Sequence, residues 1–381
     1  MIAGLNDVNG QGNAQAAAEH ILLVGGGTGG HVFPMIAVAD ALQVLQPELG
    51  LVFVGTKHGL EAQVVPARGY RLELIEAAPM RGAGPLGTVR GAFRALGSLG
   101  KARSLITRYR PRVVFSLGGY VAGAMSVAAR LSGTPLALME PNSVAGFANR
   151  VIAPFVQRAY TAFEETQRHF SKKVVLRSGV ALRSGFAPRP YAPAANNLKV
   201  LVLGGSQGAR SLNEMVPRAV ARSERISEVV HQVGRGNAAG VKTLYSELTP
   251  LPKVSVVEFI EDMPRALEQA DLVISRAGAS AVSEICAIGR PSLLIPYPFA
   301  ADDHQAHNAL ALQRAGAAVC LAAKEVSVER ITSCLEELVG NVERLVQMAR
   351  AAQAWGQPRA AEAVARDLLE LGARPEKMKV A

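Results

Sequence analysis

Each half of the 381-residue chain contains a short apolar run that ends in a glycine-rich turn and continues as a helical pattern. Residues 21–34 read ILLVGGGTGGHVFP, and residues 200–213 read VLVLGGSQGARSLN. This pattern is typical of the first strand, turn and helix of a Rossmann-like domain. The length allows two hydrophobic cores. We therefore expect an α/β fold of two Rossmann-like, doubly wound parallel-sheet domains that face each other across a cleft.

Further apolar runs alternate with helical patterns, as expected for parallel sheets covered by helices on both faces. The expected strands lie at 21–25, 51–55, 71–77, 113–118, 135–139, 199–205, 228–233, 254–260, 271–275, 291–296 and 317–322. The expected helices lie at 34–47, 88–109, 121–132, 208–222, 279–288 and 302–315. A proline-rich segment breaks the alternation and predicts a linker. The expected division is a disordered extension at 1–19, a first domain at 20–186, the linker at 187–197, a second domain at 198–350 and a C-terminal helix at 351–372.

The net charge of +10 belongs to the first half, because residues 191–381 contain equal numbers of basic and acidic side chains. Eight of the basic residues lie between Arg81 and Arg112, with no acidic residue among them, and apolar residues at helical spacing are interleaved. Such a segment suits an anionic membrane surface. It equally suits an ordinary amphipathic helix packed on its own domain. Nucleic acid is not expected as a partner, because no recognition motif is present and only 5% of residues are aromatic.

The three cysteines have no CxxC spacing, which excludes a disulfide scaffold and a cysteine-rich zinc module. No apolar run approaches the roughly 18 residues of a membrane-spanning helix. The N-terminus lacks the charge and the apolar core of a signal peptide. We therefore expect a cytoplasmic location.

Gly25, Gly27 and Gly30 satisfy the dinucleotide-binding pattern G-x-G-x-x-G. That pattern also needs an acidic residue at the end of the second strand to bind the ribose. The second strand here ends in Gly55-Thr56-Lys57, and the second half also fails this test. No G-x-x-x-x-G-K-[ST] motif is present. Nicotinamide-dependent oxidoreductases and P-loop NTPases are therefore disfavoured.

Backbone N–H groups of a glycine turn, backed by a helix N-terminus, bind anionic oxygens. Ser206 adds a hydroxyl to the second glycine turn, and a third such helix start follows the strand at 271–275. There, the segment 279–283 would present N–H groups to a diphosphate. Glu284 would accept hydrogen bonds from a ribose diol, or would stabilise the helix dipole.

His31 directly follows the first glycine turn, where it would act as a general base or bond to the local backbone at the helix start. His304 and His307 lie one helical turn apart beside Asp302 and Asp303, an arrangement that invites a metal interpretation. A polar helix start explains these four residues better, because no established metal-binding pattern is present. No metal is expected.

Seven motifs occur together in one order: GGGTGGHVFP, FSLGGYVAG, MEPNSVAGFANR, GGSQGARSLN, FIEDM, RAGASAVSE and DDHQAHNAL. With them, residues 20–370 resemble the MurG family of N-acetylglucosaminyltransferases. The resemblance implies a GT-B fold, with an acceptor domain first and a UDP-GlcNAc-binding domain second. It implies inverting transfer of GlcNAc to the C4 hydroxyl of undecaprenyl-diphospho-muramoyl-pentapeptide (lipid I), which gives lipid II for peptidoglycan. It further implies no cofactor, and a peripheral position on the cytoplasmic face of the membrane reached through the Arg81–Arg112 region.

The resemblance also implies roles for single residues of the first domain. Thr28, Gly29 and Gly30 match the first glycine loop, beside the donor and the acceptor diphosphate. Asn142 matches an asparagine that contacts the sugar, and Arg183 matches an arginine near the diphosphate. His31 matches the histidine proposed as the base.

In the second domain, Ser206 matches the serine of the second glycine loop, and Ile260 matches the residue whose backbone reads the uracil. Gln305 matches the glutamine that reads the GlcNAc hydroxyls. The diphosphate and ribose would bind to Ala279, Ser280, Ala281, Val282, Ser283 and Glu284.

The chain departs from the family pattern at 139–142, which reads MEPN, and at 179–183, which reads GVALR. These changes bear on the loops around Asn142 and Arg183. The alternatives are another GT-B glycolipid glycosyltransferase, a UDP-GlcNAc epimerase, and a catalytically silent UDP-sugar-binding protein. An epimerase would need further acidic residues in the cleft.

Overall fold

The computed structural model describes residues 19–76, 85–249 and 252–373; for residues 85–96 and for Tyr120 it describes the backbone only. The predicted disordered extension at 1–19 lies outside these residues except for Glu19. Within the described residues, no helix is long and apolar enough to cross a membrane.

The first sheet has seven strands, all parallel, in the order β3-β2-β1-β4-β5-β6-β7. The strands are β1 (His20–Val24), β2 (Gly50–Gly55), β3 (Arg71–Leu74), β4 (Val113–Ser116), β5 (Leu136–Glu140), β6 (Arg158–Thr161) and β7 (Val175–Arg177). The helices between them are α1 (Gly29–Leu45), α2 (Glu61–Ala67), α3 (Pro85–Tyr109), α4 (Tyr120–Ser132) and α5 (Phe147–Ile152).

The second sheet has six parallel strands in the order β10-β9-β8-β11-β12-β13. The strands are β8 (Leu198–Leu203), β9 (Ile226–Gln232), β10 (Lys253–Val257), β11 (Leu272–Ser275), β12 (Ser292–Leu294) and β13 (Ala318–Cys320). The helices are α6 (Arg210–Val220), α7 (Ala238–Ser246), α8 (Met263–Gln269), α9 (Ala279–Ile288), α10 (His304–Arg314), α11 (Val328–Val339), α12 (Val342–Trp355) and α13 (Ala360–Gly372).

Apolar runs become central strands because both faces of each sheet are covered. In β1, Ile21 and Leu23 join a core cluster with α1 and α13, whereas Leu22 and Val24 join a cluster with α3 and α4. Alternate residues of a strand point to opposite faces, so all four must be apolar. The prediction of two parallel-sheet α/β domains is confirmed.

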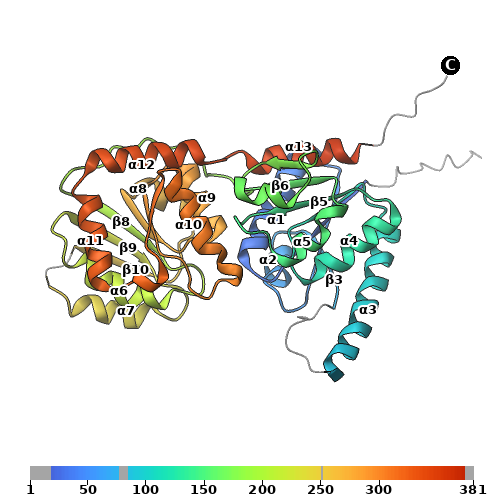
Figure 1. Ribbon diagram of the computed structural model, residues 1–381, viewed down its shortest axis with the longest axis horizontal. Helices are drawn as coiled ribbons and strands as arrows, with labels where there is room; N and C mark the ends of the chain where they lie inside the picture. The colour runs from blue at the N-terminus through green and yellow to red at the C-terminus, as the bar shows by residue number, and fades with distance from the viewer. Residues whose placement is uncertain (1–18, 77–84, 250–251, 374–381) are drawn as a thin grey trace, which may run out of the picture.

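The C-terminal segment crosses from the second domain back to the first (Figure 1). The expected helix over 351–372 is divided, because α12 ends at Trp355 and α13 begins at Ala360. The break contains Gly356, where a Cβ atom would lie 2.6 Å from the carbonyl oxygen of Cys286, and also Pro358. α13 then packs on α1 and places Val364 and Leu368 in the first domain's core.

The region between the two sheets is shared more closely than a linker at 187–197 implies. Phe163, Val180, Leu182 and Phe186 pack into a core cluster made mostly of second-domain residues. The ring of Phe163 lies 5.2 Å from the ring of Trp355 at the end of α12. The two domains are therefore joined by a packed apolar contact as well as by the chain crossings.

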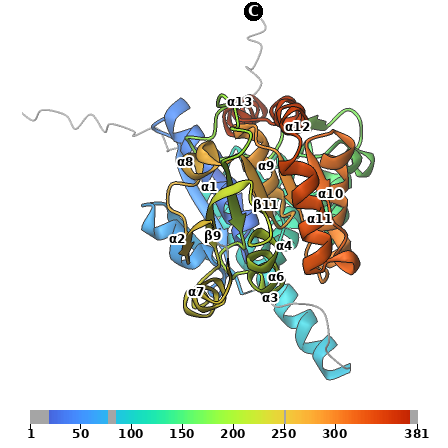
Figure 2. The same cartoon turned by 90° about the vertical axis from the view of Figure 1, so that its left-hand side faces the viewer.

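The predicted basic and apolar helix is present as α3, which packs on α4 and projects beyond the rest of the first domain in both views (Figures 1 and 2). Leu105 is buried and belongs to the domain core, so this end of the helix fits the ordinary amphipathic interpretation. Arg81 lies outside the described residues, and the side chains of Arg90 and Arg94 are not described.

Candidate active site

The strand order of each sheet reverses between two central strands, β1 and β4 in the first and β8 and β11 in the second. In open parallel sheets, ligands bind where the order reverses, at the carboxyl ends of the strands. The predicted loops lie there. The first glycine loop follows β1, Ser206 follows β8, and α9 begins four residues after β11 ends. α1 and α9 contact each other, so helix starts from both domains border one interface.

The first glycine loop is held by an acidic residue that the sequence analysis missed. Glu61, at the start of α2, is fully buried. Its carboxylate accepts hydrogen bonds from the backbone N–H of Gly27 at 2.8 Å, the backbone N–H of Thr56 at 2.8 Å and the hydroxyl of Thr56 at 2.9 Å. The end of β2 thus does have an acid beside it, but this acid binds the protein's own backbone rather than facing outward.

His31 lies in the first turn of α1 and is partly exposed. Its Nδ1 lies 3.2 Å from the carbonyl oxygen of Gly26. A carbonyl can only accept, so Nδ1 must carry the proton, and Nε2 of the neutral ring keeps its lone pair. This is the form that a general base needs.

Thr28 caps α1 through its carbonyl oxygen, which accepts from the N–H groups of His31 and Val32 at 3.1 Å each.

Asn142 lies in the loop after β5, where the sequence departs from the family pattern. Glu140 is buried and binds this loop at four points. One carboxylate oxygen accepts from the backbone and the side chain of Asn142 at 3.0 and 3.3 Å, and the other accepts from Gly146 and Asn149 at 2.8 and 2.9 Å. Proline has no backbone N–H, and none of these four bonds involves Pro141, so the loop is anchored despite its departure from the family pattern.

At the start of α9, the hydroxyls of Ser280 and Ser283 are buried and have no hydrogen-bond partner among the described residues. Buried polar groups are normally paired, so unpaired hydroxyls at a helix N-terminus favour a polar ligand there. Ala279 and Val282 are buried, Ala281 is partly exposed, and Gly278 precedes the helix in an extended conformation.

Glu284 lies one turn into α9 and is partly exposed. Burial raises the pKa of its carboxyl group to about 7, and the nearby Arg183 guanidinium opposes this shift. A carboxyl group that titrates near neutral pH is typical of functional sites, where burial and charge are arranged together.

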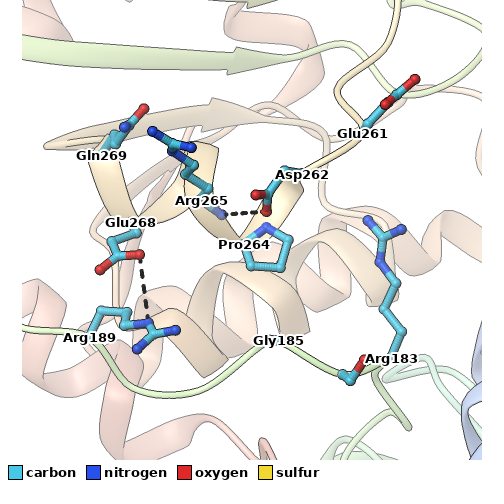
Figure 3. Close-up of a pocket in the computed structure, with 10 residues that line it drawn as sticks. Arg183, Gly185, Arg189, Glu261, Asp262, Pro264, Arg265, Glu268 and Gln269 are labelled. Atoms are coloured by element: carbon cyan, nitrogen blue, oxygen red, sulfur yellow. Dashed lines mark hydrogen bonds and ion pairs between the residues drawn. The ribbon is translucent and has the colours of Figure 1, made fainter.

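Arg183 also lines a surface cavity of about 830 Å³ between the interdomain segment and α8 (Figure 3). Glu261 and Asp262 line the same cavity, directly after Ile260. Asp262 accepts from the backbone of Arg265 and caps α8.

Ile260 is partly exposed and packs against the second domain's core. Ser206 is exposed at the glycine turn after β8.

Gln305 lies in the first turn of α10, and its Oε1 accepts from the backbone N–H of Tyr297 at 3.0 Å. Its amide N–H groups have no partner in the part of the chain that the structure describes. His304 bonds instead to the carbonyl oxygen of Ala301 at 2.8 Å, and Asp302 forms an ion pair with Arg150 of the first domain at 2.9 Å. Across the described residues, no three histidine, cysteine or acidic side chains are grouped to hold a metal.

The chain matches two family models, the glycosyltransferase family 28 N-terminal domain over residues 21–161 and the C-terminal domain of that family over residues 199–364. It is 51% identical to the UDP-N-acetylglucosamine–N-acetylmuramyl-(pentapeptide) pyrophosphoryl-undecaprenol N-acetylglucosamine transferase of Sorangium cellulosum, over 93% of this chain and 89% of that protein. It is 39% identical to the protein of the same name from Anaeromyxobacter, over 92% of this chain and 93% of that protein.

Among solved structures, the chain is similar to Acinetobacter baumannii MurG, with a TM-score of 0.80 and 31% identity over 92% of this chain and 99% of that one. A UDP-GlcNAc 2-epimerase from Neisseria meningitidis has a TM-score of 0.64 at 13% identity, covering 92% of this chain and 100% of that one, which shows a shared fold alone. The predicted GT-B fold is confirmed.

Proposed function

We propose, from the premise that this chain belongs to glycosyltransferase family 28, that it moves N-acetylglucosamine from UDP-GlcNAc to lipid I and forms lipid II. The observation that carries this function is the 51% identity to a transferase of that name over 93% of the chain. The chain is thus an N-acetylglucosaminyltransferase.

The donor nucleotide would bind to the second domain. The backbone at Ile260 would read the uracil, and Glu284 would accept from the ribose hydroxyls. The diphosphate would lie against the N-terminus of α9, where the unpaired hydroxyls of Ser280 and Ser283 and the backbone N–H groups provide donors. Ser206 and Arg183 would add a hydroxyl and a positive charge.

His31 would act as the base. Its Nε2 takes the proton from the C4 hydroxyl of the acceptor while that oxygen bonds to the anomeric carbon of the GlcNAc. The bond from this carbon to the diphosphate oxygen breaks on the opposite side, and its electron pair leaves with UDP. The N-terminus of α9 would stabilise the charge that develops on the diphosphate. Asn142 and Gln305 would hold the sugar hydroxyls.

The acceptor diphosphate would lie at the first glycine loop, along Thr28, Gly29 and Gly30. An undecaprenyl chain stays in the bilayer, so the first domain must meet the membrane. α3 and its neighbours are suited to this contact. The side chains of Lys101 and Arg103 are exposed on α3, and Leu131 of α4 and Phe147 of α5 are 68% and 64% exposed.

Vesicle binding tests this membrane surface. Changing Arg90, Arg94 and Arg103 to Glu should release the protein from anionic vesicles, and raised salt should weaken binding of the unchanged protein. The matched control changes three exposed cations of the second domain to Glu, namely Arg218, Lys242 and Arg330. Equal binding by both triple variants would place the membrane contact elsewhere.

Transfer of radiolabelled GlcNAc to purified lipid I tests the function itself. We expect label in lipid II with UDP-GlcNAc and far less with UDP-GalNAc. Label on another glycolipid but not on lipid I would indicate a different GT-B transferase. Conversion of the GlcNAc of UDP-GlcNAc to its epimer, with no transfer, would indicate an epimerase. Binding of UDP-GlcNAc without either product would indicate a silent UDP-sugar-binding protein.

A further inference from the structure

Asn308 of α10 is a fully buried polar side chain in the interface between the two domains. Figure 1 shows α10 on the side of the second domain that faces the first. Asn308 belongs to the DDHQAHNAL motif, in which only Gln305 was predicted to bind substrate. A buried amide is retained at low cost only when its donors and acceptor are all paired, so its contacts report what it holds in place.

The amide of Asn308 bonds to both domains. Its Oδ1 accepts from the backbone N–H of Ser143 at 2.9 Å, and its Nδ2 donates to the side-chain Oδ1 of Asn142 at 3.3 Å. Both of those residues belong to the first domain. Nδ2 also donates to the carbonyl oxygen of Ala277 at 3.0 Å, in the segment between β11 and α9. The orientation of the amide is unambiguous, because Ser143 offers a donor and Ala277 an acceptor.

These contacts fix the side chain of Asn142 from two directions. Its Oδ1 accepts from Asn308, and its Nδ2 donates to Glu140 at 3.3 Å. One amide hydrogen and one lone pair of Asn142 remain for a ligand. Gln305 lies three residues before Asn308 on α10, and residues at that spacing share a helix face. The two residues proposed to hold the sugar thus come from different domains: Asn142 is bonded to Asn308, and Gln305 shares a face of α10 with it.

We propose that Asn308 is a positioning residue that orients Asn142 toward the donor sugar and makes recognition of the sugar depend on closure of the two domains. This inference rests on the proposed function. UDP alone would depend far less on Asn308, because Ile260, Glu284 and the N-terminus of α9, which are proposed to bind most of the nucleotide, lie on the second domain. Binding of UDP-GlcNAc would depend on Asn308, because the sugar must also reach Asn142 on the first domain.

Asn308→Asp tests the proposal, because it keeps the acceptor for Ser143 but turns an oxygen toward the oxygens of Asn142 and Ala277. We expect kcat/KM for UDP-GlcNAc to fall by about 10–100-fold, as for loss of one or two buried hydrogen bonds. The Kd for UDP should change less than about twofold. His307→Ala, an exposed change on the same helix, is the matched control and should alter neither value.

Double-mutant analysis separates positioning from general destabilisation. If Asn308 acts through Asn142, adding Asn308→Asp to Asn142→Ala should cost little more than Asn142→Ala alone. The proposal would be overturned if the losses of kcat/KM in the two single variants multiplied in the double variant. It would also be overturned if Asn308→Asp lowered the affinities for UDP and UDP-GlcNAc equally. A wild-type protein that transfers no GlcNAc would instead refute the proposed function.

A measurement on the unchanged protein avoids variants that fold poorly. The Ser143 N–H is donated across the interface, so its exchange with deuterium reports closure of the domains. We expect UDP-GlcNAc to slow deuterium uptake in peptides covering residues 142–149 clearly more than UDP does. Equal slowing by both ligands would overturn the coupling of closure to the sugar.

Discussion

The buried carboxylate of Glu61 accepts a hydrogen bond from the backbone N–H of Gly27 at 2.8 Å, which ties the start of α2 to the first glycine loop. Three glycines make this approach possible. Cβ atoms at Gly26, Gly55 and Gly59 would lie 2.1, 2.4 and 2.0 Å from atoms of the Glu61 side chain. The Glu61 side chain thus fills the space beside the end of β2, where dinucleotide enzymes place an acid that binds ribose. The acid beside the G-x-G-x-x-G turn therefore binds the protein's own backbone at Gly27 and Thr56.

Glu61→Gln should destabilise the first domain by about 2 kcal/mol, because hydrogen bonds to a buried charged group are lost and an amide donor would face a backbone N–H. Urea unfolding measures this change. Glu48→Gln, at an exposed position, is the control and should leave stability unchanged. Unchanged stability in Glu61→Gln would mean that the glycine loop does not depend on this carboxylate.

His31→Ala should lower kcat by about 10²–10⁴-fold, the usual contribution of a general base. Affinity for UDP-GlcNAc should be nearly unchanged, because His31 is proposed to act on the acceptor hydroxyl and most of the proposed donor contacts lie on the second domain. Steady-state kinetics of GlcNAc transfer measure both quantities. A loss confined to KM would show that His31 binds substrate and does not take the proton.

His231 of β9 predicts acid sensitivity of the second domain. The residue is fully buried, its Nδ1 lies 3.1 Å from the hydroxyl of Tyr245, and burial lowers its pKa to about 4. Above pH 6.5 the imidazole is neutral in both the folded and the unfolded chain. Between pH 6.5 and 4 only the unfolded chain binds the proton, so this contribution to stability is lost as pH falls.

The expected loss is about 3 kcal/mol by pH 4, at 1.4 kcal/mol per pH unit. Denaturant unfolding at pH 7 and pH 4.5 should therefore show a smaller pH dependence in His231→Gln than in the wild type. The exposed His307→Gln should keep the wild-type dependence. Equal pH dependence in all three proteins would show that His231 is not held neutral.

Asp367 should anchor α13 to the first domain. Its carboxylate accepts from the hydroxyl of buried Tyr160 at 2.6 Å and from Nε of Arg158 at 3.1 Å. Asp367→Ala leaves both donors unpaired and should cost about 1–3 kcal/mol, with faster proteolysis around residues 356–373. Adding Tyr160→Phe should recover part of the loss, because it removes one unpaired group. Additive losses would contradict a direct interaction.

The sequence predicted the central strands because residues buried on both faces must be apolar throughout. It missed β6, whose residues include Arg158 and Tyr160, because these polar side chains are paired by Asp367 from a distant helix. It also missed β7, which has three residues at the edge of the sheet. Neither segment has the apolar pattern of a central strand.

The strand-to-helix turns that border the candidate site were predictable because their signal is local. Glycine turns, helix starts and His31 can be read within a few neighbouring residues. Glu61 and Asn308 could not be found in this way, because their partners Gly27 and Asn142 are 34 and 166 residues away. Asn308 lies within the DDHQAHNAL motif, but the motif does not show which distant residue its side chain contacts.

Calorimetric titration of the purified protein with UDP-GlcNAc and UDP-GalNAc tests the proposed donor site most directly. These sugars differ only at C4, so selective binding reports the contacts proposed for Asn142 and Gln305. We predict that UDP-GlcNAc binds clearly more tightly than UDP-GalNAc, and that Glu284→Gln weakens both. Absence of binding, or equal affinity for the two sugars, would contradict the assignment of this cleft.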